Sequence, residues 1–550
     1  MSTQGSILGN AVLRREDPTL LRGEEEYLDD LKIDGLHHVK FVRSPFAHAE
    51  LGAIDTSEAA AVEGVVGVYT AADLEIAPVV GFPMFPEHFA RPPLAIGKVR
   101  FVGDIVAAVV ATSREAAIDA AELVDVEYDP LPTVTDPEKA LEDGAPILFE
   151  EGGSNLVFEH GIGEGDALEG ADHVAEVRVV SQRLAGVPME NNGCLAIPGD
   201  KAMLYASSQN PNAVRDAVAA QLGMEPADLR VKAPAVGGGF GPKAGPYVEF
   251  MLTLKLAQTL GVPVKWAEDR SEDMVSLVHG RAMVLNAKLG LSSDGTIVGL
   301  DADVVADGGA YPAIGAFLTM FTQQMSQGVY KIPKLTFHAR SAATNTTTTA
   351  AYRGAGRPEA TQMLERVLDV AADELGIDPA ELRRKNFLQP GDFPLTTHGG
   401  ANYDSGEYEA ALDAVLAASN YSDLLAEQAK RRDSGDTKQL GIGVSAYVEV
   451  TAPAGLHVEY GAIDINDDGS VTARVGTSAH GQGHNTAFSM IISDMLGVPM
   501  DKITVLQSDT DDIPRGAGTM GSRSLQTAGS AMHVASETVL DKAKQLAGHL

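Results

Sequence analysis

The sequence predicts an α+β protein built from several domains. Its 550 residues exceed what one hydrophobic core holds, and roughly three or four domains fit this length. Apolar, β-branched runs such as residues 65–69 and 102–111 alternate with segments of helical character such as residues 114–123. Clusters of Pro, Gly and acidic residues separate these elements. We therefore expect both helices and strands in every part of the chain.

The first predicted domain covers residues 1–135. Its expected strands are residues 36–42, 65–69, 102–111 and 124–128. One helix is expected to open at residues 55–58, and a second helix, residues 114–123, is expected to be capped by Ser113. Residues 136–170 contain Pro, Gly and acidic residues with few regular periods, and they predict a linker.

A second domain is expected over residues 171–400 and a third over residues 401–550. In the second, the sequence predicts strands at residues 173–181, 285–290 and 297–306, and helices at residues 211–223, 248–260, 359–375 and 380–385. In the third, it predicts a hairpin of residues 458–465 and 471–476, a helix at 484–496, a strand at 503–507 and a helix at 527–550. No strand follows that last helix, so we expect the third domain to be truncated.

Charge and composition argue against several classes of protein. The formal net charge of −34 disfavours nucleic acid and anionic membranes as partners. Cys194 is the single cysteine, so no intrachain disulfide and no cysteine-held iron–sulfur cluster can form on this chain. No signal peptide is recognisable and no stretch approaches the roughly 18 apolar residues of a membrane span. We therefore expect a cytoplasmic protein without membrane insertion.

The most informative motif is a glycine-rich turn, VGGGFGPK, at residues 236–243. Three consecutive glycines let the backbone approach a ligand closely, and the N–H groups of such a turn suit an anion or a metal-bound oxygen. The motif is not a Walker loop, because Lys243 follows Pro242 and no Ser or Thr comes next. Taken alone, it is equally compatible with a flexible turn.

Four further segments place small or polar residues at the ends of predicted elements. Gln209 lies where a strand leads into a helix, and Arg353 lies in AYRGAGRP ahead of another helix. In AHGQGH, residues 479–484, two histidines have the spacing of a zinc-binding helix, but the Glu of that signature is absent. A turn that binds a ligand through its backbone and Gln482 is therefore favoured over a zinc helix. Residues 516–524, GAGTMGSRS, precede the last helix, whose N-terminus suits an anion. Each segment alone is also explained by ordinary caps and loops.

Together and in this order, these segments resemble the molybdopterin-binding large subunit of the xanthine dehydrogenase and aldehyde oxidase family. The closest resemblance is to the carbon monoxide dehydrogenase branch. REDP at residues 15–18 and VRSPFAHA at residues 42–49 are similar to the hammerhead domain of that family. The resemblance covers essentially the whole chain and implies a hammerhead domain over residues 1–135, followed by two molybdopterin-binding α+β domains.

The resemblance also implies a cofactor and the residues that bind it. The cofactor would be molybdenum on a pterin dithiolene, usually the molybdopterin cytosine dinucleotide in bacterial members, with no direct protein ligand to the metal. Gln209, Phe240 and Arg353 would be catalytic. Cofactor-binding positions would be Gly238, Gly239, Phe240, Gly241, Arg353, Gly481, Gln482, Gly521, Ser522, Arg523 and Ser524. In particular, Gln209 would hydrogen-bond an oxo ligand, and the Phe240 and Gly241 N–H groups would face the metal's ligands. We expect Gln209, Phe240, Arg353, Gln482 and Ser522 to meet in one pocket.

The implied reaction is hydroxylation of a small molecule, an aldehyde or an N-heterocycle, with water as the oxygen donor. Electrons would leave through iron–sulfur clusters and FAD on two partner subunits, an iron–sulfur subunit and a FAD-binding subunit, in a dimer of heterotrimers. The catalytic base of the family is a glutamate in a Gly-Glu motif further downstream, and we assign it to no residue of this chain.

Departures from the family pattern narrow the range of substrates that we expect. Gly354 stands where carbon monoxide oxidisers carry a copper-binding cysteine, which disfavours carbon monoxide oxidation. Ala244 and Ala355 stand where purine oxidisers carry a glutamate and a phenylalanine, which disfavours a purine. Two alternatives stay open: a catalytically inactive relative that serves as an assembly or cofactor-binding module, and an unrelated protein whose glycine loops bind phosphate.

Overall fold

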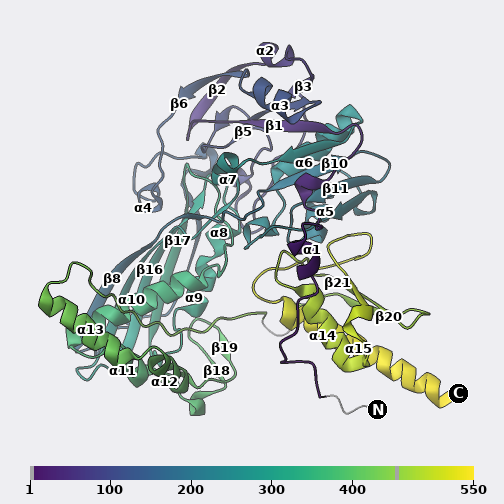
Figure 1. The fold of residues 1–550 in the computed structure, drawn as a ribbon. Helices are drawn as coiled ribbons and strands as arrows, with labels where there is room; N and C mark the ends of the chain where they lie inside the picture. The colour runs from purple at the N-terminus through teal and green to yellow at the C-terminus, as the bar shows by residue number, and fades with distance from the viewer. Residues whose placement is uncertain (1–4, 453–456, 550) are drawn as a thin grey trace.

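The computed structural model describes residues 5–452 and 457–549, which form an upper body and two lower lobes (Figure 1). The upper body contains a seven-stranded sheet and a three-stranded sheet. One lobe is built on a five-stranded sheet, and the other on a second three-stranded sheet with two long helices. None of the helices in the described ranges has the length and apolar character that crossing a membrane requires. The α+β class predicted from the sequence is confirmed.

The seven-stranded sheet has the order β12-β11-β10-β13-β1-β5-β3. Its strands are β1 (His37–Arg43), β3 (Val65–Tyr69), β5 (Ile105–Ala111), β10 (Gly193–Ile197), β11 (Ala202–Ala206), β12 (Leu229–Lys232) and β13 (Val264–Ala267). β1 runs parallel to β13, with His37 opposite Val264. Strands from both sides of the predicted linker therefore share one sheet, which fixes the N-terminal part of the chain against the next part.

Helices cover this sheet where the capping residues predict them. In α3 (Arg114–Ala121), the Ser113 hydroxyl accepts the Ala116 N–H at 3.1 Å. In α5 (Pro211–Leu222), the Asn210 side chain accepts the Ala213 N–H at 3.2 Å. α6 (Val248–Leu260) packs against β10 and β13. The helix expected from residue 55 is only the single turn α2 (Ser57–Ala60), because Gly64, at φ +91°, turns the chain into β3.

The three-stranded sheet of the upper body has the order β4-β2-β6. Its strands are β2 (Ala49–Asp55), β4 (Lys98–Val99) and β6 (Asp125–Pro130).

The five-stranded sheet has the order β7-β17-β16-β15-β8. Its strands are β7 (Leu156–Ile162), β8 (His173–Ser181), β15 (Met283–Leu291), β16 (Ile297–Gly309) and β17 (Leu335–Ala343). α10 (Arg357–Leu375) packs on β8 and β15, and α8 (Ile314–Phe317), α9 (Thr319–Met325), α11 (Pro379–Asn386), α12 (Tyr408–Ala418) and α13 (Tyr421–Ser434) complete the lobe.

The predicted linker over residues 136–170 needs a correction. It contains the short helix α4 (Pro137–Ala140) and the strand β7, which pairs antiparallel with β17. Val157 and Leu148 are buried in a cluster with Tyr311 and Ala342. The partner strand β17 lies far along the chain, so the local periodicity of the sequence did not predict β7.

The C-terminal lobe matches its predicted elements closely. Its strands are β20 (Gly461–Ile465), β21 (Val471–Val475) and β22 (Ile503–Leu506), and its helices are α14 (His484–Leu496) and α15 (Ser524–His549). β20 and β21 form the predicted hairpin, and β22 adds in parallel to β21. α14 and α15 pack together on this sheet around Phe488, Ile492 and Met532.

Candidate functional site

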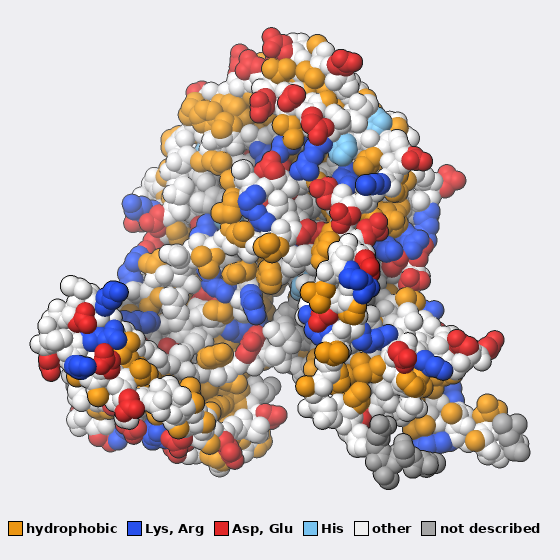
Figure 2. Space-filling view, in the orientation of Figure 1, with side chains coloured by type: hydrophobic (Ala, Val, Ile, Leu, Met, Phe, Trp, Pro, Cys, Tyr) orange, Lys and Arg blue, Asp and Glu red, His pale blue; other side chains and the backbone are white. Residues whose placement is uncertain are grey.

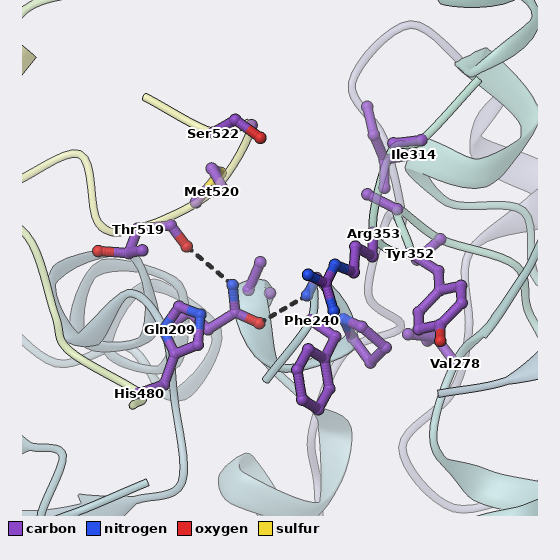
Figure 3. Close-up of a pocket in the computed structure, with 18 of the residues that line it drawn as sticks. Gln209, Phe240, Val278, Ile314, Tyr352, Arg353, His480, Thr519, Met520 and Ser522 are labelled. Carbon is purple, nitrogen blue, oxygen red and sulfur yellow. Dashed lines mark hydrogen bonds between the residues drawn. The ribbon is translucent and has the colours of Figure 1, made fainter. Parts of the chain in front are cut away.

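A cavity of about 1550 Å³ lies where the upper body and the two lobes meet. Figure 2 shows the surface hollowed between the lobes. The cavity is lined by all five residues that the sequence expects to meet, namely Gln209, Phe240, Arg353, Gln482 and Ser522 (Figure 3). Gly238, Gly241, Gly481, Gly521, Arg523 and Ser524 line it as well. Widely separated stretches of the chain thus build one site.

Gln209 is held at the centre of this site from two sides. It lies between β11 and α5, and its side chain is buried, with 2% exposure for the residue. Its side-chain nitrogen donates to the Thr519 carbonyl at 2.8 Å, and its side-chain oxygen accepts the Gly241 N–H at 2.8 Å. Its backbone N–H donates to the Lys243 carbonyl at 2.8 Å. The side chain therefore connects the glycine-rich turn to the C-terminal lobe (Figure 3).

The glycine-rich turn has a backbone that side chains would disrupt. Gly241 has φ +105°, and a Cβ there would lie 2.3 Å from the Ala351 carbonyl oxygen. A Cβ on Gly239 would lie 2.4 Å from the Gln209 side-chain oxygen. Gly239 does not itself line the cavity, so it acts by making room for Gln209. Phe240 has φ +56° and is 38% exposed at the cavity.

The sequence-based expectation for the Gly241 N–H needs a correction. This group was expected to face the metal's ligands, but it donates to Gln209 instead. The Phe240 N–H, in contrast, meets no acceptor within residues 5–452 and 457–549. Of the two amides, only that of Phe240 is therefore available to a ligand.

A buried ion pair that the sequence reasoning did not identify supports the turn from behind. The Lys243 side chain is buried and donates to the Glu190 carboxylate at 3.1 Å and to the Glu190 carbonyl at 2.8 Å. The same carboxylate oxygen accepts the Gly237 N–H at 2.9 Å and the Ser207 hydroxyl at 2.8 Å. Burial lowers the pKa of Lys243, while Glu190 opposes that shift. The sequence feature that could have indicated this pair is Lys243, a lysine at the end of a turn of small residues.

Arg353 is placed by its backbone and leaves its guanidinium exposed. Its N–H donates to the Phe240 carbonyl at 2.8 Å. Arg281 donates to the carbonyls of Tyr352 and Arg353 at 2.8 and 2.6 Å, and stacks over the Tyr352 ring at 4.9 Å. Within the described parts of the chain, the guanidinium of Arg353 has no hydrogen-bond partner. It is therefore a free cation at the cavity wall.

The C-terminal lobe contributes two glycine-containing turns. The Gln482 side-chain oxygen accepts the His480 N–H at 2.7 Å, and burial lowers the His480 pKa to about 4. Ser522 has φ +55°, and its hydroxyl lies 3.4 Å from Glu449. Arg523 is less free than expected, since it donates to the Ala517 carbonyl at 2.5 Å and to His457 at 2.6 Å.

The charge of the cavity is opposite to that of the whole chain. Among the described residues that line it, Glu449 is the single acidic side chain, against five arginines: Arg14, Arg91, Arg353, Arg357 and Arg523. Cβ atoms on Gly481 and Gly521 would meet no atom of the described residues within 4 Å, so these turns present open backbone to the cavity. Volume, positive charge and exposed backbone together fit a large, multiply anionic cofactor.

Models of known protein families match most of the chain. Residues 22–132 match the model of the aldehyde oxidase and xanthine dehydrogenase a/b hammerhead domain. Residues 148–387 and 414–550 match two models of a molybdopterin cofactor-binding domain.

Individual relatives are similar over nearly the whole chain. The carbon monoxide dehydrogenase large chain of Hydrogenophaga pseudoflava is 37% identical, over 98% of this chain and 71% of its own length. The nicotine 6-hydroxylase large subunit of Paenarthrobacter nicotinovorans is 34% identical, over 99% of this chain and 69% of its own. Quinoline 2-oxidoreductase from Pseudomonas putida 86 has a similar structure, with a TM-score of 0.93 and 34% identity over 98% of this chain and 71% of that chain.

Proposed function

Since this chain belongs to the molybdopterin-binding large subunits of the xanthine dehydrogenase, aldehyde oxidase and carbon monoxide dehydrogenase family of molybdenum oxidoreductases, we propose that it oxidises an aldehyde or an N-heterocycle, with water as the oxygen donor. The observation that carries the proposal is the meeting of Gln209, Phe240, Arg353, Gln482 and Ser522 at one arginine-rich cavity.

The cofactor we propose is the molybdopterin cytosine dinucleotide. When bound, it supplies the two-electron redox centre and the site at which an oxygen atom from water is activated. The Phe240 N–H and the Arg353 guanidinium have no acceptor among residues 5–452 and 457–549, and the second side-chain N–H of Gln209 remains after its bond to Thr519. These donors would hold the end of the cofactor where the chemistry occurs. The turns at Gln482 and Ser522 would bind its pterin and phosphates.

The proposed substrate class follows from the other end of the cavity. In Figure 3, Ile314, Val278 and Tyr352 lie on one side of Phe240, while Thr519 and Ser522 lie on the other. Val278 and Ile314 on the first side are apolar, and Val79, Val80, Leu318 and Phe321 also line the cavity. A flat, largely apolar molecule such as an aromatic aldehyde or an N-heterocycle fits a wall of this kind, because burial of its apolar surface is favourable.

Carbon monoxide is a less suitable substrate in this proposal. Gly354, at the position of the copper-binding cysteine in carbon monoxide oxidisers, has φ +100°. A Cβ there would lie 2.2 Å from Cγ of Pro358. A cysteine at this position would be strained and would collide with the Pro358 ring unless that ring moved, which supports oxidation of an organic substrate.

The proposed assembly is a dimer of heterotrimers in the cytoplasm. The similar proteins include a large chain, a large subunit and a subunit gamma of a dehydrogenase complex, which supports partner subunits for this chain. We propose that an iron–sulfur subunit and a FAD-binding subunit accept the electrons.

The test is to purify the natural complex, measure its molybdenum and released pterin, and screen aldehydes and N-heterocycles with a dye as electron acceptor. We expect one molybdenum per chain and dye reduction by members of these two classes. Gln209→Ala should greatly lower the turnover, while Gln258→Ala, an exposed glutamine of α6, should not.

Other results would contradict the proposal. A complex without molybdenum would overturn it. A complex that retains the cofactor but oxidises no substrate would favour the inactive, assembly-module alternative. Oxidation of carbon monoxide alone would overturn the substrate class.

A further inference from the structure

We propose that residues 14–27 form a strap across the wall of the cavity, which positions the turn at Gln482 relative to the glycine-rich turn and retains a bound cofactor. The strap is fixed to the upper body near Tyr27, and Arg15 and Glu16 form a latch on the C-terminal lobe at its other end. Cofactor retention rests on the proposed function, whereas the latch concerns only contacts within this chain.

The strap connects the two sides of the cavity. At the body end, Tyr27 forms a parallel β-bridge with Ala235, which directly precedes the glycine-rich turn. From there the chain runs through α1 (Asp17–Leu21) to the C-terminal lobe (Figure 1). Three residues along this path, Arg14, Leu20 and Tyr27, line the cavity. The strap is therefore part of the cavity wall.

The latch is a set of hydrogen bonds between the strap and α14. The Arg15 N–H donates to the Thr486 hydroxyl at 2.8 Å, and the Arg15 guanidinium donates to the buried Ser489 hydroxyl at 2.6 Å and the Ile503 carbonyl at 2.7 Å. The Glu16 carboxylate accepts the N–H of Thr486 at 3.0 Å and its hydroxyl at 2.5 Å. That N–H belongs to the first turn of α14, where no helix carbonyl is available to accept it. Glu16 thus caps a helix that lies about 470 residues further along the chain.

Arg14 extends the latch to the turn that we assign to the cofactor. Its guanidinium donates to the Gly481 carbonyl at 3.1 Å, and a Cβ on Gly483 would lie 3.4 Å from its Nε. Because a peptide unit is planar, holding the Gly481 carbonyl also fixes the direction of the Gln482 N–H. That N–H has no acceptor among residues 5–452 and 457–549. Arg14 is therefore a positioning residue for a donor that a ligand can use.

The two ends of the strap are held by different forces. Just after the strap, Leu28 and Leu31 are buried against Leu195 of the seven-stranded sheet. At the lobe end, the contacts are hydrogen bonds of charged side chains. Between the ends, every residue of α1 is exposed or half-buried, and Leu21 is 85% exposed. Segments with few buried apolar contacts open at a low cost in free energy, so the latch is the end that separates.

The position of the strap gives the latch a consequence for the cofactor. A ligand that contacts both turns stays bound while the distance between those turns is fixed. Gln209 connects the same two parts from inside the cavity, through its hydrogen bond to Thr519. The strap adds a second connection at the wall, and opening of the latch removes it. We therefore expect the latch to slow the release of the cofactor.

The experiment uses the purified complex with Glu16→Ala, Glu16→Gln or Arg15→Met. The control is Glu24→Ala, because the exposed Glu24 carboxylate pairs with Arg22 in the same segment. Hydrogen–deuterium exchange is measured for residues 5–22 and 484–490, since the amides of Arg15 and Thr486 donate across the latch. The loss of molybdenum during dialysis is measured on the same samples.

We expect exchange in both segments to rise about tenfold in Glu16→Ala and Arg15→Met, as for a lost hydrogen bond to a charged group. Exchange in β21, at the centre of the lobe's sheet, should stay unchanged. Molybdenum should be lost faster by a similar factor. Glu16→Gln keeps one acceptor oxygen and should have smaller effects, and Glu24→Ala should behave as wild type.

Three results would overturn the inference. Unchanged exchange in both segments would show that the latch does not hold the strap. A rise in exchange that includes β21 equally would show a general loss of folding in the lobe. A latch that opens without faster loss of molybdenum would refute the role in retention. Failure of the proposed function gives a different result, because the wild-type complex would then contain no molybdenum while exchange still reported the latch.

Discussion

The side-chain oxygen of Gln209 accepts a hydrogen bond from the backbone N–H of Gly241 at 2.8 Å. The same side chain donates to the Thr519 carbonyl at 2.8 Å. One buried glutamine thus fixes the glycine-rich turn relative to the C-terminal lobe, and the cavity lies between them. This relationship explains why the turn requires glycine at position 239, where a Cβ would lie 2.4 Å from the Gln209 side-chain oxygen.

Gly239→Ala should disturb the site without touching a ligand directly. The new Cβ would lie 2.4 Å from the Gln209 side-chain oxygen, so the glutamine must move and lose at least one of its two hydrogen bonds. We expect a loss of stability of about 1–3 kcal/mol and a lower molybdenum content in the purified complex. Gly391→Ala is the control, because a Cβ there would meet no atom within 4 Å. Equal molybdenum contents in the two variants would contradict this explanation.

The buried pair of Lys243 and Glu190 should show strong coupling. Lys243→Met leaves the Glu190 carboxylate without its cation, and we expect a loss of about 3–5 kcal/mol in the free energy of unfolding. Lys243→Met combined with Glu190→Gln should lose less than the sum of the two single variants. Denaturant titration of all four proteins measures this coupling, and additive losses would show that the pair does not support the turn.

His480 should contribute to acid sensitivity. Its folded pKa is lowered to about 4 by burial, from an ordinary value of 6.5. Between these two pH values, the unfolded chain binds a proton that the folded chain does not, so stability falls as the pH falls through this window. The decrease in Tm from pH 7 to pH 5 should therefore be smaller in His480→Gln than in wild type. His549→Gln, at the exposed end of α15, should behave as wild type, and identical slopes in all three proteins would refute the assignment.

Much of the fold could be predicted from the sequence where the signals are local. Ser113 acts as the helix cap that its position indicated. The strand β7 was missed because its stability comes from pairing with β17, far along the chain.

The candidate site likewise contains some residues that the sequence predicts and others whose role depends on the fold. Gln209, Phe240 and Arg353 were found because they lie in recognisable motifs. Arg91 lies in no motif, and its place at the cavity beside Phe101 and Tyr311 arises only from folding. The Gly241 N–H was misassigned because a sequence cannot show that Gln209 occupies it.

Gly354→Cys should not convert the protein into a carbon monoxide oxidiser. Gly354 has φ +100°, which costs an ordinary residue about 1–3 kcal/mol, and the new Cβ would lie 2.2 Å from Cγ of Pro358. We expect a lower Tm, reduced oxidation of the organic substrate and no dye reduction under carbon monoxide. A stable variant that oxidises carbon monoxide would contradict the argument from this backbone.

The most direct test of the central claim is a cryo-electron microscopy map of the purified natural complex. The claim is that one cavity holds the pterin cofactor between the glycine-rich turn and the C-terminal lobe. We expect pterin density in contact with Gln209, Phe240, Arg353 and Ser522. A complex with full molybdenum content whose cofactor density lies elsewhere, with this cavity closed by side chains, would contradict the account.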